Sequence, residues 1–203
     1  MADDTCITND TNNKETNTHV EPYYTAISNF TPYTQILFID SVLETPDDPV
    51  SQYVNESTFA LIYKYNTDRD SILEILNNFT NIKRIGFAFH GPSSNNDYRP
   101  TPFIHNELLY TPDDISTNET VCSSNVLFVK NLIQLYSESL EHVDFLACNT
   151  LLYDDWNKYF ALLQQTSNTL VIGASNDNTG NIKYGSDWIM ESTSEDIQNV
   201  YFV

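Results

Sequence analysis

The chain has 203 residues, of which 28 are acidic and 9 are basic, so its formal net charge is −19 and its pI is near 4.1. This length fits one domain, or one domain with an additional arm, and it allows a hydrophobic core without disulfide or metal cross-links. The negative charge argues against nonspecific binding to nucleic acid or to anionic membranes, which requires a basic surface. Apolar and aromatic residues make up 40% and 13% of the chain, which is typical of a folded protein.

The first part of the chain predicts an arm. Residues 8–17 have no apolar face, and Pro22 and Pro32 interrupt the stretch that follows. We therefore expect residues 1–33 to form a polar N-terminal arm and residues 34–203 to form the folded domain. Two interpretations of the arm stay open: a solvated tail, and a segment that is ordered by a protein partner.

The composition of the chain also bears on its location. The start lacks the basic residues and the apolar run of a signal peptide, and no apolar run reaches the ~20 residues that a membrane helix needs. We therefore expect an intracellular protein, or a protein within a virus particle, that does not insert into membranes.

From residue 35 onward, apolar segments typical of buried strands alternate with amphipathic segments typical of helices. In chain order we expect strands at residues 35–39 and 59–63, a helix at 68–79, a strand at 82–89, a helix at 126–136, a strand at 142–147, a helix at 154–165, and strands at 169–174 and 200–203. Polar and Pro-rich residues predict a long irregular insertion at about 92–119. The alternation predicts an α/β fold with a mainly parallel central sheet and helices on both faces.

Two residues capable of covalent catalysis directly follow expected strands. Cys148 lies at a strand-to-helix junction, where a helix N-terminus favours the thiolate. His90 can take the thiol proton, and the backbone N–H groups of Gly91 and Cys148 can hold the oxyanion of an acyl intermediate. For each residue alone a structural role is the simpler interpretation, namely a buried thiol and a hydrogen-bonded surface histidine. Because functional loops follow the carboxyl ends of parallel strands, the two together favour a His-Cys dyad.

The segments around these residues resemble those of the caspase-like cysteine peptidases. Residues 86–91 (GFAFHG) and 143–148 (VDFLAC) are similar to the "apolar strand, His-Gly" and "apolar strand, Ala-Cys" blocks of the clan that contains caspases, legumains, gingipains and separases. The histidine precedes the cysteine by a spacing of the order found in caspases, about 50 residues. The resemblance implies a three-layer caspase-like fold, peptide substrates, and catalytic roles for His90 and Cys148.

A closer resemblance is to an uncharacterised caspase-like domain found near the start of very large bacterial adhesin-type proteins. It covers about residues 35–191 and rests on five short segments in the same order: Leu37–Asp40, His90–Gly91, Ala147–Asn149, 174–180 and 185–188. Three features differ from the pattern. The segment after Gly91 is polar and Pro-rich where the bacterial relatives are rich in Gly and Leu. Leu146 stands where caspases commonly have Gln or Glu, and Gly does not follow Cys148.

Two functions remain open at this point. The first is a non-catalytic or weakly catalytic caspase-like module that acts as an interaction or assembly component, for example of a virus particle, with residues 1–33 binding a protein partner. The second is an active cysteine peptidase that uses His90 and Cys148 through an acyl-enzyme. The polar arm, a composition typical of an AT-rich genome and the three departures from the family pattern favour the first.

We expect no cofactor and no metal. Asn176, Asn178 and Gly180 form an incomplete calcium-loop pattern that a hairpin turn explains better. The remaining ligand types, at His105, His142 and Asp144, do not have the spacing of a metal site.

Overall fold

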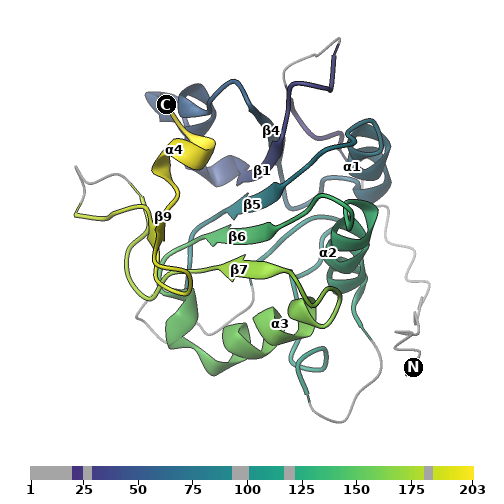
Figure 1. Cartoon of the computed structure of the whole chain (residues 1–203), viewed down its shortest axis with the longest axis vertical. Helices are drawn as coiled ribbons and strands as arrows, with labels where there is room; N and C mark the ends of the chain where they lie inside the picture. The colour runs from purple at the N-terminus through teal and green to yellow at the C-terminus, as the bar shows by residue number, and fades with distance from the viewer. Residues whose placement is uncertain (1–19, 25–28, 93–100, 117–121, 181–184) are drawn as a thin grey trace.

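The structure is a computed structural model that describes residues 20–24, 29–92, 101–116, 122–180 and 185–203. Its centre is a five-stranded parallel sheet with the strand order β4-β1-β5-β6-β7 (Figure 1). These strands span Gln35–Asp40 (β1), Thr58–Tyr63 (β4), Arg84–Ala88 (β5), His142–Leu146 (β6) and Val171–Gly173 (β7). The expected α/β fold with a parallel sheet is confirmed.

Four α-helices and several short elements surround this sheet. The helices are Arg69–Leu76 (α1), Ser124–Leu135 (α2), Asp154–Gln164 (α3) and Gln198–Tyr201 (α4). Short 3-10 turns occupy Ser41–Leu43 (η1), Val50–Tyr53 (η2) and Thr150–Leu152 (η3). Two antiparallel pairs complete the described residues: Glu44–Thr45 (β2) with Asp48–Pro49 (β3), and Ile189–Met190 (β8) with Glu195–Asp196 (β9).

The strand expected at residues 200–203 is wrong, because the chain forms the one-turn helix α4 there. The carboxylate of Asp196, two residues before α4 begins, accepts a hydrogen bond from the Gln198 N–H at 2.9 Å. The turn buries the Tyr201 side chain completely. It packs over Gly86 of β5, where an added Cβ would lie 3.0 Å from the Tyr201 ring.

The order of the strands explains why the covering elements differ on the two faces. The connection from β1 to β4 runs toward one edge of the sheet, whereas the later connections run toward the other edge. Right-handed crossovers in opposite directions lie on opposite faces. Accordingly, α1, α2 and α3 pack against one face, and the η1–η2 segment packs against the other. The direction reverses between β1 and β5, the kind of position where open α/β sheets bind ligands.

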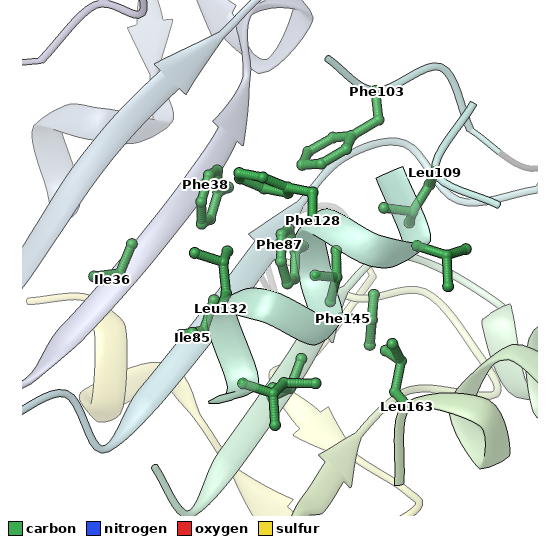
Figure 2. Packing of buried hydrophobic residues seen from close by; sticks show 14 of the residues in the cluster. Ile36, Phe38, Ile85, Phe87, Phe103, Leu109, Phe128, Leu132, Phe145 and Leu163 are labelled. Carbon is green, nitrogen blue, oxygen red and sulfur yellow. The ribbon is translucent and has the colours of Figure 1, made fainter. Parts of the chain in front are cut away.

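Successive residues of each strand point to opposite faces of the sheet, and they contribute to two separate cores. The main core contains Phe38, Phe87 and Phe145 beneath α2 (Figure 2). The ring centroids of Phe38 and Phe87 lie 4.9 Å apart, and those of Phe87 and Phe145 lie 5.4 Å apart. The neighbouring residues point to the second core, in which Leu37 and Leu146 pack with residues of α4 and the β8–β9 pair. The sheet thus lies between two covering layers, and the layer that contains the C-terminal segment buries fewer side chains than the helical layer.

A buried ion network fixes this C-terminal layer to the sheet. The guanidinium group of Arg84 donates to Asp144 on the next strand at 2.9 and 3.1 Å, and to Glu195 of β9 at 2.7 and 2.9 Å. The Tyr201 hydroxyl donates to Asp144 at 2.6 Å. One arginine therefore joins two strands of the sheet to two elements of the C-terminal segment.

The described part of the expected arm belongs to the surface of the domain. Residues 20–24 run along the free edge of β4, where Tyr23 and Ile62 exchange backbone hydrogen bonds of 3.0 and 2.8 Å. Phe30 and Tyr33 pack against the main core. The other residues of the expected arm, 1–19 and 25–28, lie outside the described residues.

The described part of the expected insertion, residues 101–116, forms no regular helix or strand. It nevertheless contributes buried side chains to the main core, namely those of Phe103, Ile104, Leu109 and Tyr110. Residues 93–100 and 117–121 lie outside the described residues. Within the part of the chain that is described, no helix combines the length and apolar character needed to cross a membrane.

Candidate functional site

The register of the sheet brings His90 and Cys148 to adjacent strand ends. Ala88 of β5 pairs with Leu146 of β6, and both candidate residues follow two positions later. The Phe89 N–H extends the pairing by donating to the Leu146 carbonyl at 3.4 Å. Phe89 lies in the main core and Ala88 in the second, so the alternation directs His90 and Cys148 to the same side. His90 is exposed, and Cys148 is a free, partly buried cysteine.

Gly91 lies directly against the backbone of Cys148. A Cβ added at Gly91 would overlap the Cys148 carbonyl oxygen and would lie 2.7 Å from the Cys148 nitrogen. These atoms belong to the backbone, so no side-chain rotation relieves the overlap. Only glycine allows the loop after β5 to approach the cysteine this closely.

The two expected oxyanion donors are therefore neighbours. Neither the Gly91 N–H nor the Cys148 N–H donates a hydrogen bond to another of the described residues. Both groups lie at the carboxyl edge of the sheet, beside the thiol. This arrangement is compatible with a shared acceptor, such as the oxygen of a tetrahedral intermediate.

The thiol itself is directed to a third partner. Cys148 Sγ donates to the backbone carbonyl of Thr179 at 3.8 Å. No hydrogen bond joins the Cys148 and His90 side chains within the described residues. The structure thus places both members of the expected dyad at one edge, with the thiol turned toward the loop after β7.

We call residues 175–180 of this loop the strap. The Asn149 N–H donates to the Asp177 carbonyl at 2.7 Å, and the Leu151 N–H donates to the Ser175 carbonyl at 3.0 Å. Asn149 has a φ of 61°, in the left-handed region that asparagine tolerates better than most residues. This turn directs the backbone N–H groups after Cys148 toward the strap.

Asp40 is a third polar residue at this edge, and its role was not predicted from the sequence. It ends β1, and its carboxylate accepts a hydrogen bond from the Val42 N–H at 3.1 Å. Burial raises the pKa of Asp40, and the Val42 hydrogen bond and the electrostatic interaction with His90 oppose this rise. The signal available in the sequence was an aspartate that closes an apolar strand, within the Leu37–Asp40 segment.

The expected effect of a helix N-terminus on the thiol is wrong. The helix α3 begins only at Asp154, and η3 lies between it and Cys148. Its first turn already contains two carboxylates, those of Asp154 and Asp155.

Three carboxylates gather at the base of the strap. Oxygen atoms of Asp177, Asp187 and Glu191 lie within 4.8 Å of one another, a separation that could hold a cation. Two of these groups already accept backbone hydrogen bonds: Glu191 from the Asn176 N–H at 3.0 Å and Asp187 from the Ile189 N–H at 2.9 Å.

The other residues considered as metal ligands serve different partners. Asp144 binds Arg84, and His142 Nδ1 lies 3.9 Å from Glu195. His105 Nδ1 lies 3.7 Å from Asp68. The structure does not bring these three residues together.

A surface cavity of about 290 Å³ lies where η3 ends and α3 begins. The described residues that line it are Leu152, Tyr153, Asp154 and Asp155, which begin four positions after Cys148. Leu152 is 62% exposed, so the cavity combines an apolar side chain with carboxylates.

Comparison of the chain with protein-family models, with curated proteins and with solved structures returned no significant match. The resemblance to caspase-like peptidases therefore stays a prediction based on the residues themselves.

Proposed function

We propose that the chain is a weakly catalytic, caspase-like module with a latent cysteine-peptidase site, in which Cys148 is the nucleophile and His90 the general base. The observation that carries this proposal is the meeting of His90-Gly91 and Cys148 at adjacent strand ends, with Gly91 against the cysteine backbone. A structural histidine and a structural cysteine do not require so close an approach of their loops.

The chemistry follows from the groups at this edge. His90 accepts the thiol proton, and the Cys148 sulfur attacks the carbonyl carbon of a peptide. The Gly91 and Cys148 N–H groups hold the oxyanion. The tetrahedral intermediate collapses to a thioester, and the amine leaves with the proton from His90. Water, deprotonated by His90, then hydrolyses the thioester, which releases the acid and restores the thiol.

The proposed site is latent because of the resting position of the thiol. Cys148 donates to Thr179 and has no hydrogen bond with His90 within the described residues. A rotation about the Cα–Cβ bond of Cys148, together with a shift of the strap, is needed before proton transfer can occur. Because this rearrangement costs free energy, we propose that the activity is low.

Incubation with a peptide library of diverse sequence tests the proposal, with new peptide termini identified by mass spectrometry. We expect slow cleavage by the wild-type protein and none by Cys148→Ser or His90→Ala. Cleavage that persists unchanged in Cys148→Ser would show that a contaminating peptidase is responsible and would remove the support for the site.

A purely structural role is the second candidate, supported by the position of residues 20–24 along the β4 edge. Residues 20–24 are thereby bound at an edge of the sheet, and in this role residues 1–33 bind a protein partner, for example in a virus particle. The test compares co-sedimentation of the full chain, and of a chain without residues 1–19, with the particles of the producing cell. We expect the chain without residues 1–19 to fold but not to co-sediment with the particles. Equal co-sedimentation of the two chains would count against this role.

A further inference from the structure

We propose that the strap, residues 175–180, is an autoinhibitory segment that holds the Cys148 thiol against the Thr179 carbonyl and must open before the thiol can reach His90. This inference rests on the proposed function, because it concerns the same nucleophile. It adds a regulatory element that lies on another loop of the fold.

The contact with Thr179 restrains the position of the thiol. The Cys148 S–H donates to the Thr179 carbonyl oxygen at 3.8 Å. This hydrogen bond directs the sulfur to the strap, and no hydrogen bond joins it to His90 within the described residues. The sulfur and Thr179 must therefore separate before the thiol can donate to His90.

The strap is held in place from both sides of the site. On one side, Asn149 and Leu151 donate backbone hydrogen bonds to Asp177 and Ser175. On the other side, the Gly180 N–H donates to the Asp187 carbonyl at 2.7 Å. Inside the strap, the buried Ser175 hydroxyl accepts from the Asp177 N–H at 3.1 Å and lies 3.2 Å from its carboxylate. Removal of this hydroxyl weakens the turn that presents Thr179.

One carboxylate at the base of the strap acts in the opposite direction. Asp177 belongs to the strap, whereas Asp187 and Glu191 belong to the segment on which it rests, and their oxygens lie within 4.8 Å of one another. Like charges at this separation repel, so the closed strap carries an electrostatic cost. Glu191 also holds the strap, because it accepts a hydrogen bond from the Asn176 N–H, whereas the Asp187 carboxylate accepts from Ile189 of its own segment. Neutralising Asp187 should therefore favour the closed strap.

The measurement is the rate of Cys148 alkylation by iodoacetamide, followed on the Cys148 peptide by mass spectrometry with the full chain. Ser175→Ala should raise the rate about two- to tenfold, the range expected when one hydrogen bond that restrains a local opening is lost. Ser139→Ala is the matched control, because it removes a hydroxyl that donates to the Ile82 carbonyl at 2.8 Å, before β5 and at the opposite end of that strand from His90. This control should leave the alkylation rate unchanged.

Neutralisation gives the test with the opposite sign. Asp187→Asn should slow alkylation at least about fourfold, the factor that Coulomb repulsion of two unit charges gives in water at 4.8 Å, the upper limit of their separation. Glu138→Gln removes an exposed charge elsewhere and should have no effect. A variant that merely loosens the fold would speed alkylation, so a slower rate separates strap closure from general destabilisation.

Equal rates in wild type, Ser175→Ala and Asp187→Asn would overturn the strap proposal. Should Ser175→Ala fail to fold, Asp187→Asn still decides, because it retains the side-chain shape. The proposed function fails separately, namely when His90→Ala alkylates at the wild-type rate and both match a free cysteine.

Discussion

Replacement of Arg84 by methionine should strongly destabilise the protein. The substitution removes four hydrogen bonds and leaves the Asp144 carboxylate, whose side chain is 0% exposed, with the Tyr201 hydroxyl as its remaining partner. A buried charge that loses its partner costs about 3–5 kcal/mol. Because small domains are stable by only about 5–15 kcal/mol, Arg84→Met should remove a large share of the free energy of unfolding.

Urea denaturation at pH 7, followed by intrinsic fluorescence, measures this loss. Lys158→Met is the matched control, because Lys158 and Asp155 form an ion pair of 3.1 Å in which both side chains are about half exposed, at 55% and 45%. An exposed pair of this kind contributes less than about 1 kcal/mol. The double variant Arg84→Met/Asp144→Leu should recover part of the stability lost in Arg84→Met, because no unpaired buried charge remains. A loss in Arg84→Met no larger than that in Lys158→Met would refute the assignment of this network as the main attachment of the C-terminal segment.

Three further predictions concern single residues. Gly91→Ala forces backbone atoms apart and should cost about 1–3 kcal/mol in urea denaturation and reduce His90-dependent alkylation of Cys148, whereas unchanged values would mean that the two loops are not in contact. The pKa of Glu195 is lowered, first by hydrogen bonds from Arg84, so the ionised carboxylate stabilises the fold fully above its unfolded pKa near 4.3, and this contribution is lost as the pH falls through the lower folded pKa. Glu195→Gln should therefore reduce the free energy of unfolding at pH 7 and make it depend less on pH in the acid range. An unchanged pH dependence in that range would contradict this. Burial raises the pKa of Asp40, so its ionised form opposes folding at pH 7. Asp40→Asn should therefore raise the urea midpoint at pH 7, lose this advantage below about pH 4, and lower the alkylation rate of Cys148. A lower urea midpoint at pH 7 would show that Asp40 stabilises the fold instead.

The sheet and the meeting of His90 with Cys148 could be predicted because both depend on local patterns. Each strand is a short apolar run, and its end is marked by a polar residue or a turn. Parallel strands that alternate with helices bring their carboxyl ends to one edge, so residues that follow two strands become neighbours. The register between Ala88 and Leu146 then confirms this placement without any need for side-chain detail.

The other parts of the site depend on contacts between residues far apart in the chain. The hydrogen bond between the Cys148 thiol and Thr179 involves a backbone carbonyl, which carries no residue-specific signal. The Arg84–Glu195 contact joins a strand of the sheet to the C-terminal segment. The helix at residues 198–201 replaces an expected strand because long-range packing of Tyr201 on Gly86 outweighs the local β propensity of an aromatic run.

The central claim is that His90 activates Cys148, and the pH profile of Cys148 alkylation by iodoacetamide tests it most directly. Wild-type protein, His90→Ala and a free cysteine peptide are compared between pH 5 and pH 9. We expect the wild-type rate to exceed that of the peptide near neutral pH and to fall to or below it in His90→Ala. Superimposed profiles for wild type and His90→Ala, both at or below that of the peptide, would contradict the claim.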